Sequence, residues 1–457
     1  MNPIETALKL GNLLQIKYIQ GSHLQLSDDI RDFEIFEMKR EDDELARQVN
    51  FNFQRSLGPA AVQAARPDVS GRAFPKSQQA TTSEHTAVYN EIDTTIELEY
   101  QLYKRALKSP KNYADPLEIE MDSKMLYHKR YLGSVNLYGD GTGVMATVLS
   151  VDQTNIAAGT IVVTAKAGRG FVGWAEWGDL FVASAPDATD PTGDIDPTGG
   201  SGFAAYRVLD KSVDDKTLTL ELVNAAGAVV TGYSASNLSE DDVFYRLGQS
   251  LRADLTGAIA DYGSATPVMA GLESLAANDG RVIHGITMNG AAAGTRIDCG
   301  GALIDAPWLQ KALSRGKDRV GRSRYKFTKM LMNSATHDSL VESVNVDRRF
   351  ISVEDKTRGI SYYAYKHEND TVEVQVSEFC PDDRIWICPE GSNGKKPLSF
   401  YGGKQEPVQA QDGTIFHLRP SASGGHEASI MTYFNMVGVM VSHHPAAIIS
   451  LSNFTNA

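Results

Sequence analysis

The sequence has few cysteines, no long apolar run and no surplus of positive charge over its 457 residues. Its three cysteines, Cys299, Cys380 and Cys388, include no C-x-x-C pair, which argues against a cysteine metal site and predicts reduced thiols. No segment approaches the ~18 unbroken apolar residues of a membrane-spanning helix, and the N-terminus lacks the basic and apolar regions of a secretory signal. The formal net charge of −13 argues against a dedicated nucleic-acid binder, because such proteins present basic surfaces.

The motifs of common enzymes are missing as well. There is no G-x-S-x-G nucleophile elbow and no H-E-x-x-H metal helix. Gly141, Gly143 and Ala146 fit the G-x-G-x-x-A pattern of dinucleotide folds, but a helix-like run precedes them and a strand-like run follows. That order is the reverse of the one that directs a helix N-terminus at a pyrophosphate. We therefore predict a tight left-handed glycine turn, no cofactor and no enzymatic activity.

A long helix followed by a strand is the clearest pattern present. Asp115 and Pro116 suit the start of a helix over residues 116–138, which carries one apolar face. Gly133 weakens the last turns of this helix. After the glycine turn, residues 144–151 alternate like a strand.

Two segments before this helix alternate with period two, as half-buried strands do: residues 47–56 and 88–102. The stretch between them is rich in Ala, Gly, Pro, Ser and Gln, and predicts an extended hairpin with a long tip or, alternatively, a disordered linker. Residues 27–44 hold nine Asp or Glu and three Lys or Arg. They are either a solvated helical face or an arm that a partner must order.

Residues 150–247 predict short strands in a small barrel or sandwich, and the run 171–177 is counted among these strands. On such a strand Trp174 and Trp177 lie on opposite faces, one in the core and one free for a contact. One loop of this region carries carboxylates that are either solvated or a calcium site without the EF-hand spacing, namely Asp187, Asp190, Asp194 and Asp196.

From residue 265 the pattern becomes α/β, with helices expected over 266–279 and 307–317 and a strand followed by a helix over 326–344. Residues 311–329 hold eight Lys or Arg and one Asp. We interpret this basic segment as a solvated surface that meets acidic residues of a neighbouring copy, rather than as a nucleic-acid site. His443 and His444 adjoin on a strand, where side chains alternate between faces, so we expect structural roles and no shared metal.

Taken together, the helix that ends in LYGDGTG and leads into a strand, the strand–turn–strand pattern of residues 372–388 and the closing strands of residues 430–453 resemble a known family. They resemble the tailed-phage major capsid proteins of the Hong Kong 97-type fold, which encapsulin shells share. The resemblance implies an α+β fold whose parts are an N-terminal arm (1–46), an extended hairpin (47–110), a spine helix that opens the peripheral domain (111–149), a β-rich insertion (150–247), an axial domain with part of the peripheral domain (248–371) and C-terminal strands that complete both (372–457).

The function that the resemblance implies is structural. Many copies would assemble into hexamers and pentamers of an icosahedral shell around double-stranded phage DNA, built in the cytoplasm of a bacterial host and ending in the virion. The short stretch before the hairpin implies a separate scaffolding protein, and removal of residues 1–40 is expected to abolish assembly of a still-folded monomer. A portal and a decoration protein are further expected partners, with only non-specific DNA contact and no membrane. Candidate assembly residues are Arg66, Arg72, Phe74, Lys76, Trp177, Arg315, Arg319, Arg322 and Arg324.

Two other functions remain open from the sequence. An encapsulin-like compartment would share the fold and enclose enzyme cargo. A carbohydrate- or ligand-binding protein would use the β-rich insertion as its binding module.

Overall fold

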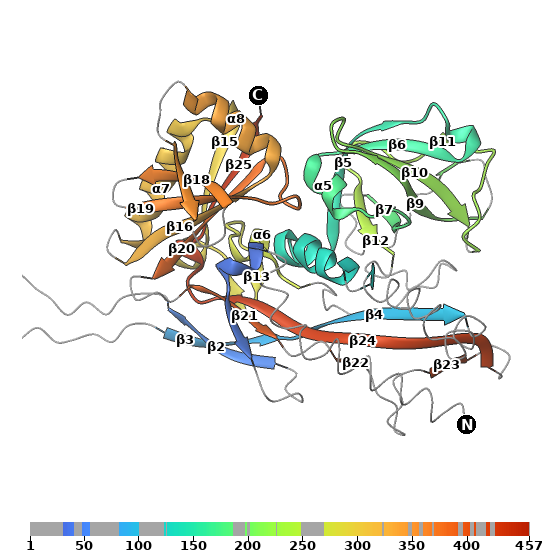
Figure 1. The fold of residues 1–457 in the computed structure, drawn as a ribbon, viewed down its shortest axis with the longest axis horizontal. Coiled ribbons are helices and arrows are strands. Elements are labelled where there is room, and N and C mark those ends of the chain that lie inside the picture. The colour runs from blue at the N-terminus through green and yellow to red at the C-terminus, as the bar shows by residue number, and fades with distance from the viewer. Residues whose placement is uncertain are drawn as a thin grey trace, which may run out of the picture.

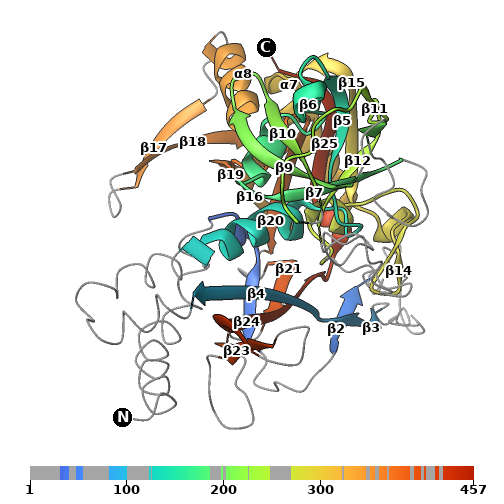
Figure 2. The ribbon, with the colours of Figure 1, turned by 90° about the vertical axis from the view of Figure 1, so that its right-hand side faces the viewer.

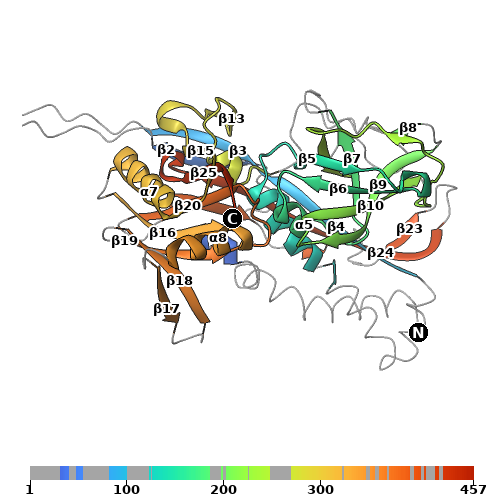
Figure 3. The same cartoon turned by 90° about the horizontal axis from the view of Figure 1, so that it is seen from above.

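The structure is a computed structural model. It describes residues 31–40, 48–54, 82–99, 123–124, 126–185, 197–198, 202–224, 226–247, 269–321, 324–345, 350–355, 360–367, 370–391, 396–402, 406–407, 417–420 and 426–456. Two compact parts, a sheet with helices and a closed barrel, lie side by side above a long β ribbon (Figure 1). Seen from above, the ribbon passes beneath both parts (Figure 3).

The barrel is closed, with strand order β10-β6-β5-β12-β7-β9. Its strands are β5 (Val144–Asp152), β6 (Thr160–Ala165), β7 (Leu180–Ser184), β9 (Phe203–Ser212), β10 (Thr217–Asn224) and β12 (Val243–Arg246). Phe171, Tyr206 and Phe244 meet inside, with Phe171 stacked on Phe244 at 5.9 Å between ring centroids. A barrel is one of the two architectures that the sequence suggested, and it begins in the strand directly after the glycine turn. Smaller elements beside it are η3 (Ile156–Ala158), β8 (Pro197–Thr198) and β11 (Ala235–Ser236).

The strand predicted over residues 171–177 is wrong. This segment forms the short helix α5 (Arg169–Trp174). The reason is a tertiary contact: a Cβ at Gly173 would lie 2.2 Å from the carbonyl oxygen of Glu378, so the bare face of the helix lies directly on another segment's backbone. The sequence analysis expected one tryptophan in the core and the other free for a contact. Trp174 is indeed buried, and Trp177 is 63% exposed.

The second compact part is a seven-stranded mixed sheet in the order β15-β25-β20-β16-β19-β18-β17. Its strands are β15 (Thr295–Leu303), β16 (Tyr325–Met332), β17 (Phe350–Asp355), β18 (Ile360–His367), β19 (Asp370–Val376), β20 (Arg384–Gly391) and β25 (Ile449–Thr455). The edge hairpin of β17 and β18 stands out from the body in Figure 2. The predicted strand–turn–strand over residues 372–388 is present, but β16 lies between its two strands, parallel to β19 and antiparallel to β20.

The helices of this part follow the sequence signals. α7 (Ala306–Val320) begins after Asp305, whose carboxylate accepts a hydrogen bond from the Trp308 backbone N–H at 3.1 Å, as an N-cap does. α8 (Ser334–Asn345) follows β16, so the strand–helix prediction is confirmed. By contrast, the helix expected over 266–279 is reduced, in its described part, to the single turn α6 (Leu272–Leu275). The neighbouring short elements are β13 (Val282–Ile283), β14 (Ile286–Thr287), η4 (Gly290–Ala292) and η5 (Pro445–Ala447).

The ribbon is built on β24 (His426–Ser442), a strand of 17 residues. At about 3.3 Å per residue, such a strand spans roughly 55 Å. Its partners are β4 (Asn90–Glu99), β21 (Leu398–Gly402), β22 (Glu406–Pro407) and β23 (His417–Pro420), and β1 (Glu37–Arg40) adds a parallel strand beside β21.

The predicted hairpin exists, but its second strand differs from the prediction. β2 (Gln48–Gln54) pairs with β3 (Thr82–Val88), which the sequence analysis assigned to the tip. The segment predicted as its partner forms β4 and pairs with β24. The alternating pattern of β4 was read correctly as a strand, but alternation does not reveal which strand will be its partner.

The long helix is described over residues 123–138 apart from residue 125. Its last turns widen into the π-helix η2 (Leu132–Asn136) around Gly133, where a Cβ would lie 2.6 Å from the Phe379 ring. The glycine turn that follows has the predicted left-handed geometry, with φ of +82° at Gly141 and +85° at Gly143. No described helix is long and apolar enough to cross a membrane.

The polar N-terminal segment is described over residues 31–40, and the arm expected over residues 1–46 stays a prediction. Residues 31–36, with η1 (Arg31–Ile35), enter the chain's own core, and Phe33, Ile35 and Phe36 are at most 3% exposed. Phe33 meets Phe400 edge to face at 5.6 Å. Acidic residues outnumber these three apolar side chains, but all three join the same hydrophobic cluster. Their burial offsets the entropy cost of ordering the segment. Residues 1–30 and 41–46 lie outside the described residues.

Candidate functional site

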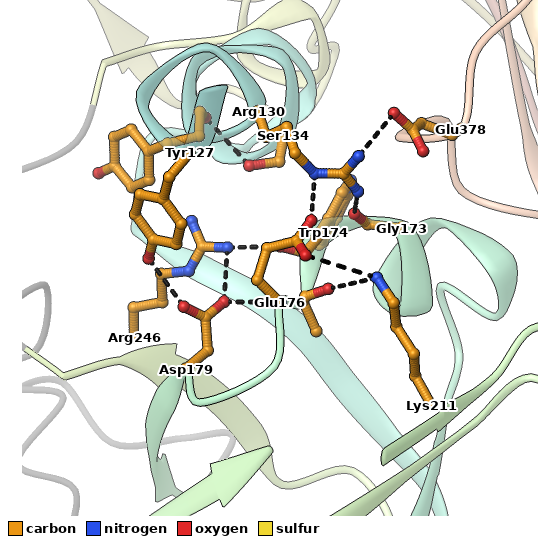
Figure 4. Close-up of polar contacts among 12 residues, drawn as sticks. Tyr127, Arg130, Ser134, Gly173, Trp174, Glu176, Asp179, Lys211, Arg246 and Glu378 are labelled. Atoms are coloured by element: carbon orange, nitrogen blue, oxygen red, sulfur yellow. Dashed lines mark hydrogen bonds and ion pairs between the residues drawn. The ribbon is translucent and has the colours of Figure 1, made fainter. Parts of the chain in front are cut away.

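A buried polar cluster joins the long helix to the barrel (Figure 4). Tyr127 comes from the helix, Asp179 from the turn before β7, and Arg246 from the end of β12. Arg246 Nη2 donates to Asp179 Oδ2 at 3.0 Å and to the Trp174 carbonyl oxygen, and Tyr127 Oη donates to Asp179 Oδ1 at 2.8 Å. The side chains of Arg246 and Asp179 are each 6% exposed. This buried ion pair joins β12 to the turn before β7, and the hydrogen bond from Tyr127 joins the helix to both.

A second set of charges continues the cluster toward the surface. Arg130 pairs with Glu176 and with Glu378, whose Oε1 lies 3.2 Å from Nη1, and also donates to the Gly173 carbonyl oxygen at 3.0 Å. Lys211 lies 3.7 Å from the other oxygen of Glu176. The helix, α5 and the turn after β19 are therefore joined by charges of alternating sign.

Burial shapes the protonation of the tyrosines in this cluster. Burial, partly opposed by Arg246, raises the pKa of Tyr127 well above its ordinary value. Burial also raises the pKa of Tyr131 to about 12. Both phenols therefore stay protonated at neutral pH, Tyr127 donates to Asp179, and both rings offer flat surfaces: the Arg246 guanidinium lies 5.3 Å from each ring centroid.

The arrangement lacks the parts of a catalytic centre. Its charged groups are matched in pairs, and it has no nucleophile beside a base. Among the described residues no group of three His, Cys, Asp or Glu is placed to hold a metal ion. The cluster does border a cavity of about 590 Å³, lined in part by Trp177, Lys124 and Arg246. Its chemistry is that of a contact surface: cations, aromatic rings and buried donors.

The sequence reasoning found only one residue of this site, Trp177. Its indole is stacked against the Lys211 ammonium, with Nζ 4.6 Å from the ring centroid. Tyr127, Asp179 and Arg246 were missed because they are separated in sequence and lie on a helix, in a turn and on a strand, at positions that carry no motif. The calcium candidates Asp187, Asp190, Asp194 and Asp196 lie outside the described residues, as do the assembly candidates Arg66, Arg72, Phe74, Lys76 and Arg322.

The remaining assembly candidates lie in the basic segment at α7 and β16. Arg315 is exposed on α7. Arg319 turns back on its own chain and donates to the carbonyl oxygens of Gly294 at 2.8 Å and Ala293 at 2.9 Å, so its guanidinium fastens the loop before β15. Arg324 lies over the Tyr325 ring at 5.3 Å.

The interpretation of this basic segment as a wholly solvated surface needs correction. Lys317 is 4% exposed and forms an ion pair of 3.1 Å with Asp370 on β19. Lys329 pairs with Glu34 of the N-terminal segment. Acidic residues of the same chain thus neutralise part of the positive charge that the sequence analysis assigned to a neighbouring copy.

The paired histidines lie between β24 and η5, and not on a strand as the sequence analysis expected, but their side chains have separate partners. His443 lies against Phe51 of the hairpin at 5.9 Å and hydrogen-bonds Ser399 Oγ through Nε2 at 3.1 Å. His444 points the other way and stacks on Tyr325 at 5.4 Å. Burial lowers the pKa of His444 to about 4, so this ring is neutral at physiological pH.

The cysteines are free and buried. Burial raises the pKa of Cys299 to about 11 and that of Cys388 to about 12. Thiols in this state are poor nucleophiles.

Comparison with known proteins gives matches in structure. No protein-family model and no curated protein matches the sequence. The capsid of an empty GTA particle matches with 9% identity and a TM-score of 0.42 over 92% of this chain and 88% of that one. The capsid asymmetric unit of cyanophage A-1(L) matches with 9% identity and a TM-score of 0.40 over 90% and 89%. The chain is thus similar to capsid structures along most of its length, at low sequence identity and low TM-score.

The likeness to encapsulins is narrower. The holo-SrpI encapsulin complex from Synechococcus elongatus PCC 7942 matches with 11% identity and a TM-score of 0.24, over 37% of this chain and 59% of that chain.

Proposed function

We propose that this chain is a major capsid protein that assembles into the hexamers and pentamers of an icosahedral shell around double-stranded DNA. The observation that supports it most is the ribbon of β4 and β24. The ribbon runs beneath both compact parts, and its central strand is about 55 Å long at roughly 3.3 Å per residue (Figure 1). Such a shape extends the reach of one subunit across the next, which a compact monomeric enzyme does not need.

The rest of the described molecule agrees with a structural role. Its buried charges are paired to join elements, as Asp179 and Arg246 do, and are not placed around a reactive centre. Copies of one chain that dock different faces against each other form rings when the rotation closes. Weak single contacts then add up in the complete shell.

The partners and location follow from the same proposal. The shell would form in the cytoplasm of a bacterial host with a separate scaffolding protein and a portal, and would end in the virion, with or without a decoration protein. The net charge of −13 suits a wall that makes only non-specific contact with packaged DNA.

The test is negative-stain imaging of the full-length chain, expressed alone and with candidate scaffolding proteins. Closed particles, rings or curved sheets support the proposal. Nuclease-protected DNA in particles purified from infected cells distinguishes a capsid from a compartment that encloses enzyme cargo. A chain that stays monomeric under every condition contradicts the proposal.

A further inference from the structure

A cavity of about 530 Å³ lies between the N-terminal segment and the seven-stranded sheet. Its apolar lining includes Phe33, Ile35 and Met38 of the segment and Pro389 of β20. Met38 is 39% exposed, so part of this apolar lining is open to solvent. A long side chain with an apolar stem and a charged end can therefore enter from outside.

The charged side chains of the lining include two acids without an ion pair. Lys329 pairs with Glu34, and Lys396 Nζ donates to backbone carbonyl oxygens of the N-terminal segment. Glu373 and Glu390 are only half-buried, and no described cation forms an ion pair with either. Three acids against two lysines leave the lining with one negative charge, which one further cation neutralises.

The outer face of α7 carries a cation of the required kind. Lys311 and Arg315 are exposed one helical turn apart. The Lys311 ammonium lies over the Trp308 ring at 4.0 Å, so it has a partner on its own helix. No described residue forms an ion pair or a hydrogen bond with Arg315. Its guanidinium presents several donors on a long apolar stem, which suits an apolar cavity that holds two carboxylates.

The cavity and α7 lie on opposite faces of the same sheet. α7 shares a core with Met330 of β16, whereas Phe33 and Phe36 share one with Leu331, the next residue of that strand. Successive side chains of a strand point to opposite faces, so the sheet separates the two cores. Arg315 therefore cannot reach the cavity of its own chain, but the same two surfaces on successive copies can meet head to tail. A contact of this kind forms a ring when the rotation closes.

We propose that Arg315 of one copy enters the cavity beside the N-terminal segment of the next copy and binds Glu373 and Glu390. This contact rests on the proposed function, because a shell brings copies of one chain into heterologous contact, and it names the two surfaces that meet. The N-terminal segment forms one wall of the cavity, so it must be seated in its own chain before the next copy can dock.

The experiment exchanges the two charges in the full chain. Glu373→Lys and Arg315→Glu each place like charges opposite one another, so we expect each to raise the concentration needed for assembly at least about tenfold. The double variant restores opposite charges and should assemble within about threefold of wild type. Glu373→Lys combined with Lys166→Glu is the matched control, because it has the same net charge but the second change lies on the barrel, and it should not recover. Circular dichroism melts show whether each variant folds, and Glu390→Lys replaces Glu373→Lys if the latter does not.

The other outcomes overturn the contact. Wild-type particles together with unchanged assembly of both single variants mean that the two surfaces do not meet, and the proposed function then stands without this inference. Recovery in both double variants means that net charge alone sets assembly, and recovery in neither means that Arg315 and Glu373 are not partners. A wild-type chain that never assembles contradicts the proposed function and this contact with it.

A second measurement tests the contact without reversing any charge. Arg315→Cys and Glu373→Cys are combined in one chain, and assembled particles are treated with a short bismaleimide. The native cysteines are buried and react poorly with such a reagent. We expect a ladder of linked copies on a denaturing gel from the double variant and none from either single variant. Intact particles of the double variant that give no ladder overturn the contact.

Discussion

Asp32 should make the stability of the folded chain depend on pH in a way that one substitution removes. Its carboxylate is 5% exposed and accepts hydrogen bonds from Tyr138 Oη at 2.6 Å and Ser377 Oγ at 2.5 Å, both at Oδ2. Burial raises the pKa of Asp32 from 3.8 to about 6, although the two hydroxyl donors oppose the shift. Among the described residues no cation forms an ion pair with Asp32, and the more distant Lys329 adds only a weaker favourable interaction to the two hydroxyl donors.

The magnitude follows from linkage. A folded pKa above the unfolded value means that the contribution of Asp32 to stability is complete below about pH 4 and is lost as the pH rises through about 6. At 1.36 kcal/mol for each pKa unit, the loss is on the order of 3 kcal/mol. Asp32→Asn keeps the shape and an acceptor oxygen but cannot ionise, so its stability lacks this pH-dependent loss.

The assay is urea unfolding of unassembled wild-type and Asp32→Asn chains at several values between about pH 4 and pH 7. The difference in unfolding free energy, variant minus wild type, should rise by about 3 kcal/mol over this range, because every other titrating group cancels in the difference. Leu209→Ala, an exposed apolar position on the barrel, should show a difference that does not change with pH. A flat difference for Asp32→Asn would refute the reasoning, as would one that falls as the pH rises.

Three more predictions concern elements that hold the fold together. Deletion of residues 1–40 removes the buried side chains Phe33, Ile35 and Phe36 and should lower the unfolding free energy by roughly 5 kcal/mol or more. Deletion of residues 1–30 keeps these side chains and serves as the control. Equal melting temperatures for the two truncations would contradict the prediction. Gly133→Ala pushes a methyl group into the Phe379 ring and should lower the unfolding free energy by about 1–3 kcal/mol. Gly178 has open space around it, so Gly178→Ala should lose only the free energy of its backbone strain. Calorimetric unfolding of both variants measures the two losses. Asp179→Ala leaves Arg246 charged and buried without its partner and should lower the unfolding free energy, measured in urea, by about 3–5 kcal/mol. A loss below about 1 kcal/mol would show that Asp179 does not hold helix and barrel together through Tyr127 and Arg246.

Local signals in the sequence predicted those elements whose causes are local. The helix predicted over residues 307–317 lies within α7, and the glycines at 141 and 143 required a left-handed turn that the structure contains. Alternating apolar positions gave the strands of the barrel, because one face of each strand is buried against the others.

The errors arose where a distant segment decides the local structure. Residues 171–177 alternate like a strand, but Gly173 lies on the backbone at Glu378, some two hundred positions along the chain. β4 carries a correct strand pattern but pairs with β24, far away in sequence, rather than with β2. In the N-terminal segment, acids outnumber the three apolar residues that hold it in the core, so composition alone indicated a solvated or partner-bound arm.

The candidate site was the least predictable part. Arg246 ends a short strand, Tyr127 lies on a helix and Asp179 in a turn, and no spacing rule connects them. Only Trp177 carried a signal, because a large aromatic residue on a strand-like run must face either the core or a contact. Its exposure in the folded chain is what directs attention to the neighbouring cavity.

The most direct test of the central claim is the mass of the purified full-length chain, measured by size-exclusion chromatography with light scattering over a range of salt concentrations, with and without a scaffolding protein. The proposal predicts species in the megadalton range that coexist with capsomer-sized rings. A single species with the mass of one or two chains under all of these conditions would contradict it.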